Sequence, residues 1–291
     1  MSPEILSSLK PQHDFFVGID SDGCVFDSME VKQKEFFIPN ALKYFELWPI
    51  SGLLRKTWES VNLYSINRGG NRFISLIKVF DLLSKNETVK KHRILLPDTN
   101  LLKQWVATEN KLGNDTLRKF VEKHPDSSLK KILLWSEAVN EDITKWLRNI
   151  PPFENVKPAI EKIIKAADLV VISQTPSEAV IREWKENGLD VYTRAIAGQE
   201  YGTKSEQLKH AAGGKYDKDK VIMIGDAIGD LNASEANGIL FFPIIPGKEE
   251  ESWKIFINEG LPVFLEGKFL GDFQKNIINE FRRSLPENLI M

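Results

Sequence analysis

The chain has 291 residues, of which 42% are hydrophobic and 27% are charged, and its formal net charge at pH 7 is -2. This length and composition are typical of a globular protein with one large domain or two smaller ones. The charge gives no electrostatic reason to expect nucleic acid or an anionic membrane as a partner, and no run approaches the roughly 18 apolar residues of a membrane span. The single cysteine, Cys24, excludes an internal disulfide, and residues 1–12 lack the apolar core of a signal peptide, so we expect a cytoplasmic protein.

The first predicted strand covers residues 15–19, a short apolar run that includes two β-branched residues. It runs directly into Asp20 and Asp22, and Gly23 then permits a tight backbone turn. Two carboxylates at the end of a buried strand are costly unless a positive charge compensates them. The pattern therefore predicts a cation at this strand end, and a metal ion is the simplest candidate.

Residues 28–152 show helical spacing of apolar residues and no convincing strand, which predicts an all-helical domain. Asp98 and Ser127 are the expected N-caps of two of its helices. The expected helices cover residues 42–58, 73–83, 99–111, 116–123 and 128–147.

A turn within this helical insert carries two arginines, Arg68 and Arg72, on either side of a glycine pair. We favour the interpretation that it connects two helices and that both arginines are solvated. The alternative hypothesis is that Arg68 or Arg72 contacts the substrate.

Two further apolar runs, residues 169–172 and 221–225, predict strands that are covered on both faces, as in a parallel sheet. Helices are expected between the strands, over 156–166, 178–187 and 204–212, with short strands over 190–197 and 239–245. This alternation predicts an α/β fold with a doubly wound, parallel, Rossmann-like sheet. The core domain is expected to combine residues 1–27 and 153–291, with residues 28–152 inserted as a helical cap domain. Two helices, around 252–258 and 273–283, are expected to pack onto this core or to form a partner surface.

Polar side chains follow each of the three apolar runs, and in parallel sheets ligands bind beyond the carboxyl ends of the strands. We therefore expect Asp20 and Asp22, Ser173, and Asp226 with Asp230 to meet at one rim of the sheet. Taken singly, each residue has an ordinary explanation, such as a helix cap or a charge that the helix dipole favours. Their convergence is what predicts an active site.

These residues resemble the motifs of the haloacid dehalogenase superfamily, in its phosphatase and phosphomutase branch. Residues 20–28, Asp-Ser-Asp-Gly-Cys-Val-Phe-Asp-Ser, look like the first motif of that family. Ser173, Lys204, and Asp226 with Asp230 follow in the order of its remaining motifs. The resemblance implies that the helical insert is a mobile cap joined to the core by two hinge segments.

A phosphate monoester is doubly anionic, so attack on it by a carboxylate requires a cation to reduce the repulsion. Mg²⁺ prefers oxygen ligands and commonly takes one or two carboxylates together with a substrate phosphate. We assign Asp20 and Asp226 as ligands, with Asp230 binding directly or through water. The resemblance adds the main-chain carbonyl of Asp22.

We predict that Asp20 is the nucleophile that forms an aspartyl-phosphate and that Asp22 is the general acid and base. Ser173 would donate a hydrogen bond to a phosphoryl oxygen, and Lys204 would neutralise charge on those oxygens. Gly23 and Gln174 are additional candidates for substrate contact.

The predicted function is that of a Mg²⁺-dependent phosphatase acting on a small phosphorylated metabolite, as a monomer or a homodimer. A sugar phosphomutase of the same superfamily is the first alternative, since no residue separates the two. A 2-haloacid dehalogenase is disfavoured because that branch lacks the second aspartate, whereas Asp22 is present here. A binding protein that keeps the fold without turnover is the alternative from another class.

Overall fold

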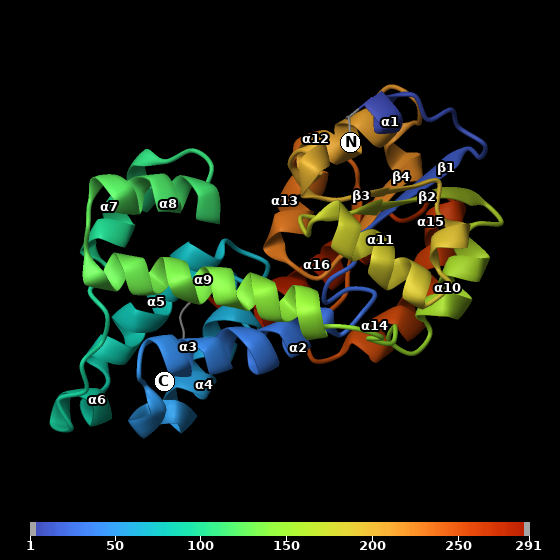
Figure 1. Ribbon diagram of the computed structural model, residues 1–291. Helices are drawn as coiled ribbons and strands as arrows, with labels where there is room; N and C mark the ends of the chain where they lie inside the picture. The colour runs from blue at the N-terminus through green and yellow to red at the C-terminus, as the bar shows by residue number, and fades with distance from the viewer. Residues whose placement is uncertain (1–3, 288–291) are drawn as a thin grey trace. The chain divides into compact units, whose positions relative to one another are not determined.

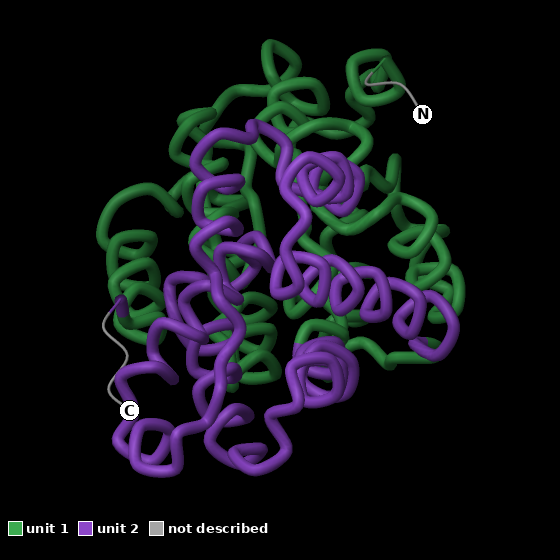
Figure 2. Tube along the Cα trace, turned by 60° about the vertical axis from the view of Figure 1, so that its left-hand side comes forward, with its two compact units in different colours: residues 1–29, 148–286 green, residues 30–147, 287–291 purple. Residues whose placement is uncertain are grey.

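The computed structural model describes residues 4–287. The chain divides into two compact units, one built from residues 1–29 and 148–286 and the other from residues 30–147 and 287–291 (Figure 2). We call them unit 1 and unit 2. Within the described part of the chain, no helix is both long and apolar enough to cross a membrane.

Unit 1 is built on a five-stranded sheet in which every pairing is parallel (Figure 1). The strand order is β3-β2-β1-β4-β5, so the chain moves outward from β1 to β3 and then crosses to the other side of β1. This reversal confirms the predicted doubly wound sheet and places the topological switch point between β1 and β4. The strands are β1 (Phe15–Ile19), β2 (Ala167–Ile172), β3 (Ala195–Ala197), β4 (Val221–Gly225) and β5 (Leu240–Pro243).

The sheet is covered on both faces, which explains why its central strands read as continuous apolar runs. Along β1, Val17 and Ile19 belong to one buried cluster and Phe16 to another, as the alternation of side chains in a strand requires. The first cluster is completed by helices α10 (Val156–Ile163), α11 (Ser177–Glu186), α14 (Glu249–Ile255) and α15 (Leu261–Leu265). The second is completed by α1 (Glu4–Ser7), α12 (Lys204–Ala212), α13 (Ile228–Asn237) and α16 (Asp272–Ser284).

The C-terminal segment packs onto the core, in agreement with one of the two possibilities expected for it. Trp253 of α14 is fully buried, and its indole N–H donates to the main-chain oxygen of Cys24 at 2.9 Å. Phe281 of α16 is fully buried in the second cluster. A π-helical segment, Phe256–Gly260, continues α14 toward α15.

Residues 30–147 contain no strand and enclose a hydrophobic core of their own. Trp58, Trp105 and Trp135 are almost completely buried in it. The helices from residue 28 to the end of this unit are α2 (Ser28–Val31), the π-helical η1 (Lys32–Phe37), α3 (Ile38–Tyr44), the 3₁₀ helix η2 (Trp48–Ile50), α4 (Ser51–Asn62), α5 (Arg72–Lys85), α6 (Glu87–Lys91), α7 (Asn100–Thr108), α8 (Asn114–Lys123) and α9 (Ser127–Trp146).

Some of the expected local elements were wrong. Residues 42–58 are not one helix, because α3 ends at Tyr44 and Glu46 takes a left-handed conformation with φ 57°. The cap of α9 is Asp126, whose Oδ1 accepts from the backbone N–H of Leu129 at 2.7 Å, and Ser127 is already helical. Helix α7 is directly preceded by Thr99, which makes no capping bond through its side chain, whereas Oδ1 of Asp98 accepts from the backbone N–H of Asn100 at 2.9 Å and so caps the helix start as expected. The expected strand over 190–197 is reduced to β3, since a 3₁₀ turn occupies Asp190–Tyr192.

Neither Arg68 nor Arg72 is a fully solvated turn residue, contrary to our expectation, because Arg68 is buried and Arg72, the first residue of α5, is half-buried. Arg68 is only 2% exposed and donates to the main-chain oxygen of Leu63 at 3.0 Å. Arg72 donates to Ser136 and Asn140 of α9, and its guanidinium lies 4.9 Å from the centre of the Phe37 ring. Burial lowers the pKa of Arg72 to about 10. Both side chains therefore hold unit 2 together, since long aliphatic stems pack well beneath a hydrogen-bonded head.

Candidate active site

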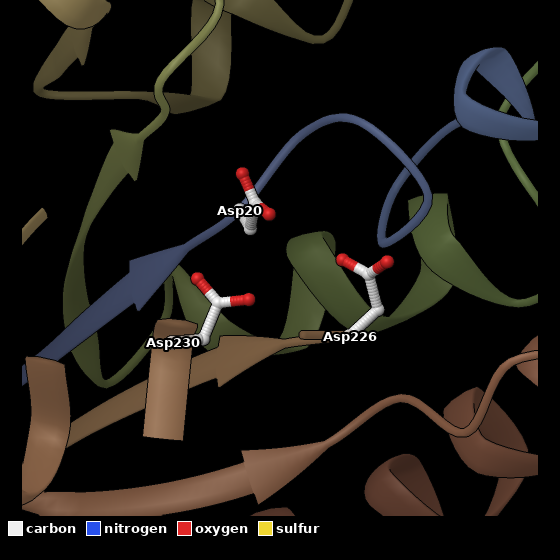
Figure 3. A group of neighbouring side chains, drawn as sticks. All are labelled: Asp20, Asp226 and Asp230. Atoms are coloured by element: carbon white, nitrogen blue, oxygen red, sulfur yellow. The ribbon is translucent and has the colours of Figure 1, made fainter. Parts of the chain in front are cut away.

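Three buried aspartates meet at the carboxyl end of the sheet, beside the switch point between β1 and β4. Asp20 follows β1 directly, whereas Asp226 and Asp230 follow β4 (Figure 3). One carboxylate oxygen from each residue lies within 4.8 Å of those of the other two. The backbone N–H of Asp20 also donates to the main-chain oxygen of Ile224 at 2.9 Å, which carries the strand pairing up to the site. The register of the sheet thus brings distant parts of the sequence together here.

Asp230 reaches the cluster because the chain turns tightly between β4 and α13. Its Oδ2 accepts from the backbone N–H of Ala227 at 3.0 Å, which satisfies one of the free donors at the start of the helix. Gly225 makes room for this side chain, since a Cβ added at Gly225 would lie 2.4 Å from Cγ of Asp230. The glycine before Asp226 is therefore required by packing, although its backbone φ is not in the left-handed region.

Replacing Gly225 with alanine should displace the Asp230 carboxylate and weaken the affinity of these carboxylates for a divalent cation by roughly 10- to 100-fold, the usual effect of disturbing groups around a metal site. The measurement is Mg²⁺ affinity by isothermal titration calorimetry. Gly229→Ala is the control, because no atom lies within 4 Å of a Cβ added at Gly229 in α13. The control should keep its affinity and gain slightly in stability. Equal affinities for both variants would contradict the packing argument.

Lys204 is the positive group of the site. Its Nζ lies 2.7 Å from Oδ2 of Asp20 and 2.5 Å from Oδ1 of Asp230. It occupies the first turn of α12, whose observed bounds are those predicted from the sequence. Thr203 and Glu206 form a capping box that begins the helix at this position. The helix start therefore fixes where the lysine enters the site.

The rim holds more acidic than basic groups. If all three carboxylates are ionised, the ammonium of Lys204 leaves a net charge of two negatives among these buried groups. Burial raises the pKa of Asp20, and the neighbouring Asp230 and Asp226 add to this rise while Lys204 opposes it. Burial alone would lower the pKa of Lys204, but Asp20 and Asp230 outweigh it and raise that pKa above its ordinary value.

The donor set fits a small divalent cation. All of its side-chain ligand atoms are carboxylate oxygens, which suit Mg²⁺ far better than softer metals. Asp20 and Asp226 directly follow the two adjacent central strands, whereas Asp230 lies in the first turn of α13. Lys204 and one backbone N–H bind Asp20 and Asp230 alike, so all three carboxylates are candidate ligands.

Asp22 is half-buried on the turn after Asp20, outside the three-carboxylate group. One of its oxygens accepts a hydrogen bond from the hydroxyl of Ser28, and the other lies 3.5 Å from Oγ1 of Thr175. Gly23 has φ 82° and donates its N–H to the main-chain oxygen of Phe26 at 2.9 Å. This left-handed turn, which glycine adopts without strain, directs the chain after Asp22 back toward the sheet.

Ser173 directly follows β2 and is fully buried. Its N–H donates to the main-chain oxygen of Ala197, and its Oγ accepts from the N–H of Thr175 at 3.1 Å. A hydroxyl that accepts in this way can still donate its own proton to a ligand. Gln174 is exposed, and its Nε2 donates to the main-chain oxygen of Gly202 at 2.9 Å. The structure thus places Ser173 at the rim and uses Gln174 to join two loops.

The sequence did not indicate the hydrogen bonds that hold the turn from Asp20 to Asp22 in place. Ser21 is fully buried, and its backbone N–H donates to Oδ1 of Asp20 at 2.8 Å. Its hydroxyl accepts from the indole N–H of Trp184 at 3.0 Å and lies 3.3 Å from Oε2 of Glu183. Both partners belong to α11, more than 160 positions further along the chain, so no local pattern could have indicated them.

Comparison with known proteins decides the family. A model described as haloacid dehalogenase-like hydrolase matches residues 77–244, which is more than half of the chain. The chain belongs to the haloacid dehalogenase-like hydrolase family. This confirms the superfamily that the motifs resembled, and it agrees with the observed sheet. No curated protein matches this hydrolase in sequence.

Solved structures resemble this hydrolase at low identity. A predicted phosphoglycolate phosphatase from Haemophilus somnus 129pt is 15% identical, with a TM-score of 0.47, over 80% of this chain and 86% of its own. A predicted phosphatase from Clostridium acetobutylicum is 16% identical, with a TM-score of 0.42, over 80% and 85%. A HAD-superfamily hydrolase of subfamily IA from Geobacter sulfurreducens PCA is 15% identical, with a TM-score of 0.41, over 80% and 88%.

Proposed function

We propose that this hydrolase is a Mg²⁺-dependent phosphatase that cleaves a small phosphorylated metabolite through an aspartyl-phosphate on Asp20. The observation that carries the proposal is the rim group of three buried carboxylates with Lys204 between two of them. Such a site has the charge and oxygen donors to hold a divalent cation beside a dianionic substrate.

Asp20 is positioned as a nucleophile by two hydrogen bonds. Lys204 holds its Oδ2, and the backbone N–H of Ser21 holds its Oδ1. In the first step a carboxylate oxygen of Asp20 attacks phosphorus, and the bond from phosphorus to the ester oxygen breaks. Asp22 gives its proton to the departing oxygen, which leaves as an alcohol.

The second step returns the enzyme to its starting state. Asp22, now ionised, removes a proton from a water molecule that attacks the phosphorus of the aspartyl-phosphate. The bond to Asp20 breaks, inorganic phosphate leaves, and Asp22 regains its proton. Throughout, the Lys204 ammonium and the Ser173 hydroxyl stabilise charge on the phosphoryl oxygens. Bound Mg²⁺ would supply further neutralisation of the phosphate and of Asp20.

The test is release of inorganic phosphate from a panel of phosphate monoesters by the purified full chain, with and without Mg²⁺. Turnover of at least one small phosphorylated metabolite, dependent on Mg²⁺, is the expected result. Phosphorus NMR of hexose phosphates in the same samples separates hydrolysis from transfer, because a phosphomutase would form an isomer without free phosphate. A chain that binds phosphate esters but neither hydrolyses nor isomerises them would be a binding protein that has kept the fold.

A further inference from the structure

Gln207 lies on α12, three residues after Lys204, and is completely buried. Its Nε2 lies within hydrogen-bond distance of three main-chain oxygens, those of Ser173 at 3.0 Å, Gly198 at 3.0 Å and Gly202 at 2.9 Å. The first belongs to the loop after β2, and the other two belong to the loop between β3 and α12. One side chain thus joins the loop that begins at Ser173 to the loop that leads into Lys204 at the start of α12.

Stability alone does not account for an amide at this position. Among residues 4–287, no hydrogen-bond partner reaches the buried Oε1 of Gln207, which is an energetic cost. The three carbonyl groups have other donors: the N–H of Tyr201 binds the Gly198 oxygen, and Nε2 of Gln174 binds those of Gly202 and Ser173. An apolar side chain of similar length would therefore remove an unsatisfied oxygen and leave each carbonyl with a donor. The Gln207 amide provides a fully buried connection between the two loops, whereas Gln174 joins them from an exposed position.

A second set of contacts shows that these loops are closely fitted. Oε2 of Glu200 accepts from the backbone N–H of Ser177 at 2.9 Å and also from the Ser177 hydroxyl. A Cβ added at Gly198 would lie 2.5 Å from the backbone nitrogen of Ser177. The loop before α12 therefore rests directly on the start of α11, which is the far end of the Ser173 loop. Gln207 connects the same two loops through its hydrogen bonds to the oxygens of Ser173, Gly198 and Gly202.

We propose that Gln207 is a positioning residue, which sets the separation of Ser173 and Lys204 and thereby the fit of the site to a phosphoryl group. The predicted loss of activity rests on the proposed function, whereas the predicted role of Gln207 in setting the positions of Ser173 and Lys204 does not. Misplacement of catalytic groups by about 1 Å can cost on the order of 100-fold in rate. Gln207 itself touches neither substrate nor metal, because its amide is enclosed by the two loops.

The test compares the full-length variant Gln207→Met with Gln274→Met. Gln274 of α16 is the control, because its Oε1 accepts from the N–H of Phe241 at 3.0 Å within unit 1 but at the start of β5, away from the site. With p-nitrophenyl phosphate and Mg²⁺, Gln207→Met should lose about 10- to 100-fold in kcat/KM. Inhibition by inorganic phosphate should weaken in parallel, while the melting temperatures of the two variants stay similar. The control should keep wild-type kinetics.

Gln207→Glu provides a pH-dependent readout. A protonated carboxyl group can donate one of the missing hydrogen bonds, whereas a carboxylate would face the carbonyl oxygens without a donor. The activity of this variant relative to wild type should therefore rise as the pH is lowered, and the corresponding ratio for Gln207→Met should not.

Three results would overturn the inference: wild-type kinetics for Gln207→Met, equal losses in Gln207→Met and Gln274→Met, or a flat pH ratio for Gln207→Glu. A wild-type chain that is inert towards phosphate esters would instead overturn the proposed function. In that case a crystal structure of Gln207→Met decides the geometric part, since unchanged positions of Ser173 and Lys204 would refute it.

Discussion

Replacing Asp20 with asparagine should reduce phosphatase activity by at least about 10³-fold while leaving the protein folded. The amide cannot form the aspartyl-phosphate, although it has nearly the same shape as the carboxylate it replaces. Acid-quenched wild-type protein incubated with a labelled phosphate ester should carry a phosphoryl group that hydroxylamine releases. The variant should carry none.

Asp14→Asn is the matched control for this prediction. Asp14 is exposed and immediately precedes β1, at the end of the strand opposite Asp20. Its replacement removes the same charge from the same segment of chain and should change neither turnover nor phosphoryl incorporation. Substantial activity in Asp20→Asn, with no change in the labelled intermediate, would show that another group accepts the phosphoryl.

Removing divalent cations should reduce the rate of phosphate release about as strongly as replacing Asp20 with asparagine. At an effective dielectric constant near 20, two unit charges 4 Å apart repel by about 4 kcal/mol, or about 10³-fold in rate. Treatment with EDTA should therefore abolish phosphate release, and excess Mg²⁺ should restore it. Asp226→Asn should require a much higher Mg²⁺ concentration, whereas Asp219→Asn, at an exposed position, should behave as wild type. Activity that persists after exhaustive chelation would contradict the prediction.

Thermal unfolding gives a readout of the same site without substrate. The folded-state pKa of Asp20 is raised by burial and by the neighbouring aspartates, so its contribution to stability is fully present below the unfolded pKa of about 3.9. That contribution is lost as the pH rises through the folded pKa. Because Mg²⁺ binds the ionised form, the rise in melting temperature on adding Mg²⁺ should grow with pH. Asp226→Asn should raise the melting temperature of the metal-free protein and remove the response to Mg²⁺.

The sequence by itself determined the features that depend on short-range pattern. The run at residues 15–19 followed by Asp20 and Asp22 indicated a strand end with uncompensated charge, and the structure places a strand and a buried carboxylate there. Helix α12 begins and ends where its pattern predicted. Apolar periodicity and capping residues act within a few positions of each other, so they can be read along the chain.

Only the tertiary structure decided which side chains meet. Lys204 and Asp20 are separated by 184 positions, and the three carbonyl oxygens that bind Gln207 lie on two loops. Arg72 looked like a solvated turn residue, yet its partners at Ser136 and Asn140 lie 64 and 68 positions away on α9. Such pairings follow from sheet register and helix packing, which fix the distance between segments that no local propensity connects. For that reason the sequence indicated the acidic groups of the site and Lys204, while supporting residues such as Ser21, Trp184 and Gln207 emerged only from the folded chain.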